Sequence, residues 1–154
     1  MGSARRIRSY IVKPRQPWVK ERIDEELALV GEFGLRSKKE LYAAASTLRK
    51  MRAAARSYLA LPAEERASRE KELISRLHKL GLIDEDASLD DVLSLDIRAI
   101  LNRKLQSIVQ AKGLAKSPHE ARQLIVHGRV KVGGKVARNP SKLVTRIEET
   151  TVSL

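Results

Sequence analysis

The feature that most constrains the fold is a change of hydrophobic spacing in the last third of the chain. From Leu101 onward, apolar residues recur three or four positions apart, which is the spacing of helices that bury one face. Further on, Val130 and Val132 alternate with basic residues, and Gly133-Gly134 supplies a two-residue hairpin turn. This change from a helical period to a strand period predicts a small module of two helices and a short antiparallel sheet.

Local signals place the elements inside this module. Gly113 interrupts the first helix, and Ser117 followed by Pro118 is a strong start for the second, with Ser117 as its N-cap. Beyond the hairpin, alternating apolar residues predict a last strand formed by Leu143, Thr145 and Ile147.

The residues before this module predict a helical region. Helical spacing places helices at about 18–30, 37–61, 62–80 and 88–93, and another begins at Asp96. Ser37 and Glu40 have the spacing of a capping box. The remaining start and stop signals are Gly31, Gly81, and Ser88 with Asp91. The fold class is therefore α+β, a mostly helical N-terminal region plus a helix-turn-helix-like module with a short antiparallel sheet.

The composition limits the core and the chemistry. Of the residues, 42% are hydrophobic but only 3% aromatic, so the core must be aliphatic. There are no cysteines, which excludes disulfides and thiolate zinc sites, and the three histidines are too scattered for a metal site. The longest stretch without charge is Leu41–Leu48, whereas a membrane span needs about 20 residues. We expect a cytoplasmic protein without a membrane segment.

The net charge of +12 is concentrated at the two ends of the sequence. Residues 1–20 carry +6, residues 21–100 carry −2, and residues 101–154 carry +8. A surface that only needs solubility mixes both signs, so this segregation favours a nucleic-acid partner. The acids gather in residues 60–100, which predicts an anionic side that faces solvent or another protein.

Two basic elements precede the module. Residues 1–17 have no helical period and predict an extended arm that becomes ordered on its partner. The helix expected at 37–61 carries a stripe of cations that have no acid four positions away. This favours contact with a phosphate backbone over a solvated face. The cations of arm and stripe are Arg5, Arg6, Arg8, Lys13, Arg15, Lys38, Arg49, Arg52 and Arg56. Trp18 either anchors the first helix in the core or stacks on a base, and we favour the core.

Several long sequence segments in the last third of the chain resemble those of a known protein family. They are Gly113–Ser117, Ala121–Ile125, His127–Val136 and Asn139-Pro140. Together they resemble the RNA-binding domain named after small-subunit ribosomal protein four. Earlier strings resemble the archaeal and eukaryotic form of that ribosomal protein, and they are Pro17-Trp18, Arg22–Leu27, Phe33–Leu41, Ser88–Leu93 and Arg103–Gln106.

Two departures from the family narrow the resemblance to the archaeal type. The N-terminal cysteine cluster of many bacterial members is absent, so no zinc is carried over. The basic tail of eukaryotic members is also absent. We divide the chain into a basic arm at 1–17, a helical domain at 18–100, the RNA-binding domain at 101–150 and a tail at 151–154.

The resemblance implies a structural ribosomal protein that binds small-subunit ribosomal RNA at a multi-helix junction and helps to nucleate assembly. Neighbouring ribosomal proteins would be its other partners, without cofactor, metal or small-molecule substrate. The expected contacts of the module are Arg103, Lys104, Lys116, Ser117, His119, Arg122, Gln123, Arg129, Lys131 and Lys135. Ser117 either contacts RNA or only caps its helix.

Other functions compete with this interpretation. The same domain is appended to pseudouridine synthases, tyrosyl-tRNA synthetases and RNA chaperones. We expect no enzyme, because the acids lie at helix starts and polar turns rather than paired in a cleft. The helix-turn-helix invites DNA binding, but the strands carry as much charge as the helix. A stand-alone RNA chaperone or translational repressor remains the alternative.

Overall fold

The computed structural model describes residues 11–154, and over these it forms eight helices and three short strands. The helices are α1 (Lys20–Glu32), α2 (Lys38–Leu59), α3 (Ala63–Lys79), α4 (Leu89–Ser94), α5 (Ile97–Asn102), α6 (Leu105–Ala111), α7 (Pro118–Val126) and α8 (Arg146–Thr150). The strands are β1 (Lys131–Val132), β2 (Lys135–Val136) and β3 (Val152–Ser153). None of the helices in this part of the chain is long and apolar enough to cross a membrane.

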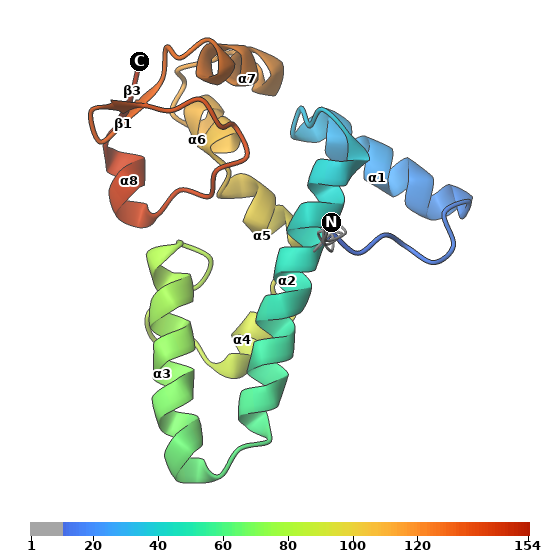
Figure 1. Cartoon of the computed structure of the whole chain (residues 1–154), viewed down its shortest axis with the longest axis vertical. Helices are drawn as coiled ribbons and strands as arrows, with labels where there is room; N and C mark the ends of the chain where they lie inside the picture. Colours follow the sequence, from blue (N-terminus) through green and yellow to red (C-terminus); the bar gives the residue numbers. More distant parts are fainter. Residues whose placement is uncertain (1–10) are drawn as a thin grey trace, which may run out of the picture.

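Helix α2 is the spine of the molecule (Figure 1). It packs against α1, α3, α4 and α5, with α1 beside its N-terminal half and α3 beside its C-terminal half. Its buried side chains contribute to two aliphatic clusters. One cluster joins Leu41 and Leu48 to Ile100 and Leu101, and the other joins Ala55 to residues of α3 and α4. Aliphatic packing thus holds the helical region together, as the composition predicts.

A third cluster holds the C-terminal module together. It joins α6 and α7 to the inner face of the sheet and includes Leu105, Val109, Ile125 and Val130, all completely buried. The strand order is β2-β1-β3, with both pairs antiparallel. Gly133-Gly134 forms the hairpin turn with φ angles of 58° and 76°, which only glycine adopts readily. The predicted hairpin is confirmed.

The predicted last strand at residues 143–147 is wrong. Thr145 and Glu148 form a reciprocal capping box, in which the threonine hydroxyl accepts from the Glu148 amide and the carboxylate accepts from the Thr145 amide. This box starts α8, so Ile147 lies on a helix and is 78% exposed. The third strand is β3, which pairs with β1 inside residues 151–154, where we expected a tail.

The other boundary predictions have mixed outcomes. Ser117, Asp96 and the Ser88–Asp91 box cap their helices as expected. Helix α1 runs through Gly31, and Gly34, with φ of 56°, follows its end. The helix expected from residue 101 onward is interrupted at residues 103–104, which separate α5 from α6.

Two further predictions fail for reasons of packing. The Ser37 side chain makes no capping bond, since the Glu40 amide donates to the Ser37 carbonyl at 3.1 Å. The other half of the box is also missing, because the Glu40 carboxylate accepts from Arg122 instead of the Ser37 amide. Trp18 is 89% exposed and therefore does not anchor the core. The arginine that binds Glu40 lies far away in sequence, and no described part of the chain covers Trp18.

Candidate RNA interface

The C-terminal module exposes a set of cationic and polar side chains. Helix α7 and the segment before it present Lys116, His119 and Gln123, the last two spaced four positions apart on one helical face. The hairpin presents Arg129, Lys131 and Lys135. These six side chains make no hydrogen bond or ion pair with any other residue of 11–154. Their charges and donors are therefore available to an external anion.

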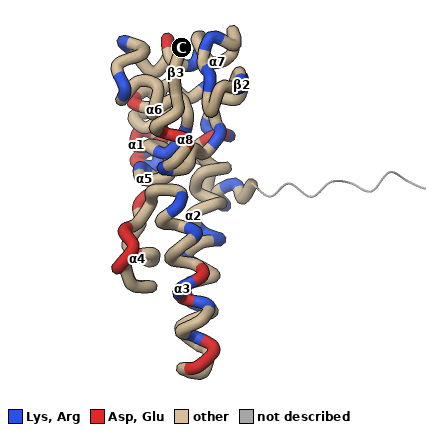
Figure 2. The backbone as a smooth tube through the Cα atoms, turned by 90° about the vertical axis from the view of Figure 1, so that its left-hand side faces the viewer, with Lys and Arg blue, Asp and Glu red and all other residues tan. Residues whose placement is uncertain are grey.

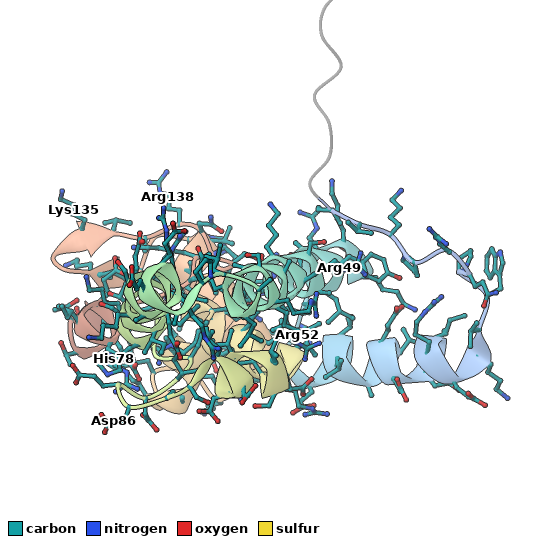
Figure 3. All side chains as sticks on the ribbon, turned by 90° about the horizontal axis from the view of Figure 1, so that it is seen from below. Arg49, Arg52, His78, Asp86, Lys135 and Arg138 are labelled. Atoms are coloured by element: carbon teal, nitrogen blue, oxygen red, sulfur yellow. The ribbon has the colours of Figure 1, made fainter. Side chains whose placement is uncertain are left out.

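Arg138 belongs with these residues, although the sequence-based set omits it. It is exposed, lies two residues beyond β2, and extends beside Lys135 along the same edge of the molecule (Figure 3). The absence of any acid within four positions of Arg138 is the signal that could have identified it. Asp86 lies at the opposite edge of the molecule.

Three arginines of α2 form the second basic element. Arg49, Arg52 and Arg56 line one groove with a cavity volume of 340 Å³, and Ile97 forms part of its wall. Arg49 and Arg56 are exposed, whereas Arg52 is half-buried and donates a hydrogen bond to the Leu95 carbonyl. The groove therefore offers two free guanidiniums and a third that is held in place.

The N-terminal arm is the third basic element. Lys13 and Arg15 are exposed, and the Val12 amide donates to the Ser46 hydroxyl at 3.0 Å, which ties the arm to α2. The remaining predicted contacts of the arm, Arg5, Arg6 and Arg8, lie outside the described residues.

Several predicted RNA contacts turn inward instead. The side chain of Arg103 is only 14% exposed, since it forms an ion pair with Glu149 at 2.7 Å and donates to the Val144 carbonyl at 2.9 Å. Lys38 forms an ion pair with Glu26 at 3.1 Å. These cations stabilise the fold. The distribution of charge along the sequence does not distinguish this structural role from RNA binding.

Ser117 and Arg122 are also engaged within the protein, and Lys104 is buried. The Ser117 hydroxyl accepts from the Glu120 amide at 3.2 Å and caps α7. Lys104 is 6% exposed. Arg122 donates to both carboxylate oxygens of Glu40, at 2.7 and 3.2 Å, and so joins α7 to the first turn of α2.

This joint between the helical region and the module is polar and well connected. Gln106 is buried, and its Nε2 lies 2.9 to 3.0 Å from the carbonyl oxygens of Phe33, Gly34 and Pro118. Burial alone would raise the pKa of Glu40, but the hydrogen bonds and charge of Arg122 outweigh it and hold that pKa below its ordinary value. The joint therefore contains an ionised carboxylate.

The opposite side of the molecule is acidic. Asp84, Glu85, Asp86, Asp90 and Asp91 are all exposed in and before α4. Figure 2 shows acidic segments on α4 and at one end of α3, away from the basic segments of α2. The acids of α4 thus lie apart from the arginines of α2, which leaves the α2 side suited to a polyanion.

Comparison with known proteins confirms the family that the sequence segments resemble. Residues 103–149 match the S4 domain. Small ribosomal subunit protein uS4 of Ignicoccus hospitalis is 51% identical over 152 residues, covering 99% of this chain and 92% of that protein. The proteins of the same name from Hyperthermus butylicus and Sulfurisphaera tokodaii are 48% and 44% identical, each covering 99% of this chain and 86% of the relative. The chain therefore belongs to the family of small ribosomal subunit protein uS4, in its archaeal type.

Proposed function

We propose that the chain is a structural component of the small ribosomal subunit that binds ribosomal RNA directly. The observation that carries the proposal is the near full-length similarity to relatives of that name. The free cations on the hairpin, just before α7 and in the α2 groove support it, because phosphate neutralisation dominates the affinity of proteins for nucleic acid.

The shape of RNA explains how these cations would be used. The major groove of an RNA helix is too deep and narrow for side chains, so contacts go to phosphates, 2′-hydroxyls and the geometry of junctions. The arm, the α2 groove and the module are three separate basic elements on an elongated body. Three separated contacts suit a junction of several helices better than one uniform duplex, and holding such a junction would help to nucleate subunit assembly.

Sedimentation and binding measurements test the proposal. We expect the native protein to sediment with small subunits, and the purified protein to prefer RNA from the 5′ region of small-subunit ribosomal RNA over tRNA at matched salt. Equal affinity for any duplex would contradict binding at a junction. A protein found mostly off ribosomes would favour a free RNA chaperone or translational repressor.

A further inference from the structure

A cavity of 390 Å³ lies at the joint between the helical region and the C-terminal module. Its polar lining comes from both parts: Ser37, Lys39 and Glu40 from the start of α2, and Lys104 and Ser141 from the module side. Of the RNA contacts expected from the sequence, only Lys104 lines this cavity.

Lys104 is the unusual member of the lining. It is 94% buried, judged from its exposed fraction of 6%, yet its ammonium makes no hydrogen bond or ion pair with any residue of 11–154. Burial lowers the pKa of this ammonium, and only the nearby charge of Glu40 opposes that shift. Glu40 in turn is held by Arg122 at 2.7 Å. The ammonium nitrogen is not fully enclosed by protein and reaches the cavity, where an oxyanion would supply the missing acceptor.

The start of α2 adds a second, independent attraction for an anion. The Ser37 side chain makes no capping bond, and the backbone amides of Lys38 and Lys39 have no acceptor among the described residues. This uncapped end of a 22-residue helix carries the positive end of the helix dipole. Lys39 is exposed and lines the same cavity.

The charges of the lining leave room for one anion. Glu40 and Arg122 neutralise each other, so Lys104 and Lys39 remain as excess positive charge, while the Ser141 hydroxyl donates to Glu40 at 3.3 Å. We propose that this cavity receives one phosphate group of the bound RNA backbone, which accepts hydrogen bonds from Lys104 and Lys39. The inference rests on the proposed function and names a specific place where RNA enters the protein.

The position of this phosphate gives it a role that surface contacts do not have. Because the cavity is lined by α2 on one side and by the module on the other, a phosphate inside it binds to both parts at once. RNA binding would therefore stabilise the relative orientation of the helical region and the module.

The ammonium nitrogen of Lys104 provides the most direct test. In the wild-type protein with nitrogen-15 labelled lysines, a fragment of the small-subunit RNA should shift the Lys104 ammonium resonance and slow its proton exchange. The variant Lys104→Met identifies that resonance. It should bind RNA roughly ten- to a hundredfold more weakly, and its dependence of log affinity on log salt should be shallower by about 0.9.

Lys71→Met is the matched control, since Lys71 is exposed on α3 and makes no ion pair within the described chain. It should leave both affinity and salt dependence unchanged. If RNA binds normally but neither the Lys104 resonance nor the salt dependence of Lys104→Met changes, the inference is overturned and the proposed function is not. If the wild-type protein binds no RNA, the proposed function itself fails.

Inorganic phosphate distinguishes the two possible sources of the anion. A shift of the Lys104 resonance by RNA, with or without a weaker shift by inorganic phosphate, supports a backbone phosphate in the cavity. A shift by inorganic phosphate that RNA does not reproduce would overturn the assignment to RNA.

Discussion

Replacement of Gly34 by alanine should disrupt the joint between the two parts of the protein. Gly34 has a φ of 56°, and an added Cβ would lie 2.7 Å from Pro118 Cβ and 3.0 Å from Gln106 Nε2. The left-handed conformation costs alanine about 1–2 kcal/mol. The contact with the rigid proline adds about 1–3 kcal/mol, since neither the ring nor the backbone behind it can move freely. We expect a loss of roughly 2–5 kcal/mol in the free energy of unfolding.

Two other glycines separate these contributions. Gly113 has a φ of 72° but open space around it, so Gly113→Ala should cost only the conformational part, about 1–2 kcal/mol. Gly31 lies inside α1 with nothing within 4 Å, so Gly31→Ala should stabilise by about 0.5–1 kcal/mol. Urea denaturation measures all three, and each kcal/mol should move Tm by about 2–4 °C. If Gly34→Ala costs no more than Gly113→Ala, the joint is not closely packed and the reasoning is wrong.

Three further predictions follow from contacts described above. Arg49→Gln should reduce the slope of log affinity for RNA against log salt by about 0.9 without changing the free energy of unfolding. Arg103→Gln should lower the free energy of unfolding by about 1–3 kcal/mol and leave that slope unchanged. The reverse pattern would contradict their assigned roles. The Glu40–Arg122 pair should stabilise the fold above pH 4.5, and this contribution should be lost as the pH falls below that value, because a carboxyl with a lowered pKa binds its proton more weakly when folded. The free energy of unfolding of wild type should therefore exceed that of Glu40→Gln at neutral pH and approach it in acid, and a constant difference would refute the pair's ionisation. Trp18, the sole tryptophan, should emit like tryptophan in water and be fully accessible to iodide, and blue-shifted, protected emission would contradict its exposure.

The elements predicted correctly from sequence are those whose signals are local. Ser117 caps its helix through the amide of Glu120, three residues away, and Gly133-Gly134 makes its turn with immediate neighbours. Such contacts form whatever the rest of the chain does. Thr145 and Glu148 carried the same kind of local signal, but the alternation of Leu143, Thr145 and Ile147 imitates a strand and obscured it.

The incorrect predictions depend on distant partners. Ser37 and Glu40 have the spacing of a capping box, but Arg122, 82 residues further on, takes the Glu40 carboxylate. Likewise, Arg103 looks like any other basic residue of the module until Glu149 is placed beside it. The basic character of the interface is thus visible in sequence, whereas the division between cations that bind and cations that support the fold needs the tertiary structure.

The separation of bases and acids described for Figure 2 also affects how the protein approaches its partner. Opposite charges on opposite sides give the molecule a permanent electric dipole, and the field of a polyanion exerts a torque on it. At physiological salt this field decays over about 8 Å, so the torque acts only in the last stage of an encounter. Within that distance the protein rotates until its basic side leads. The acids near Asp86 touch nothing in such an encounter, yet they raise the fraction of collisions that begin in the correct orientation.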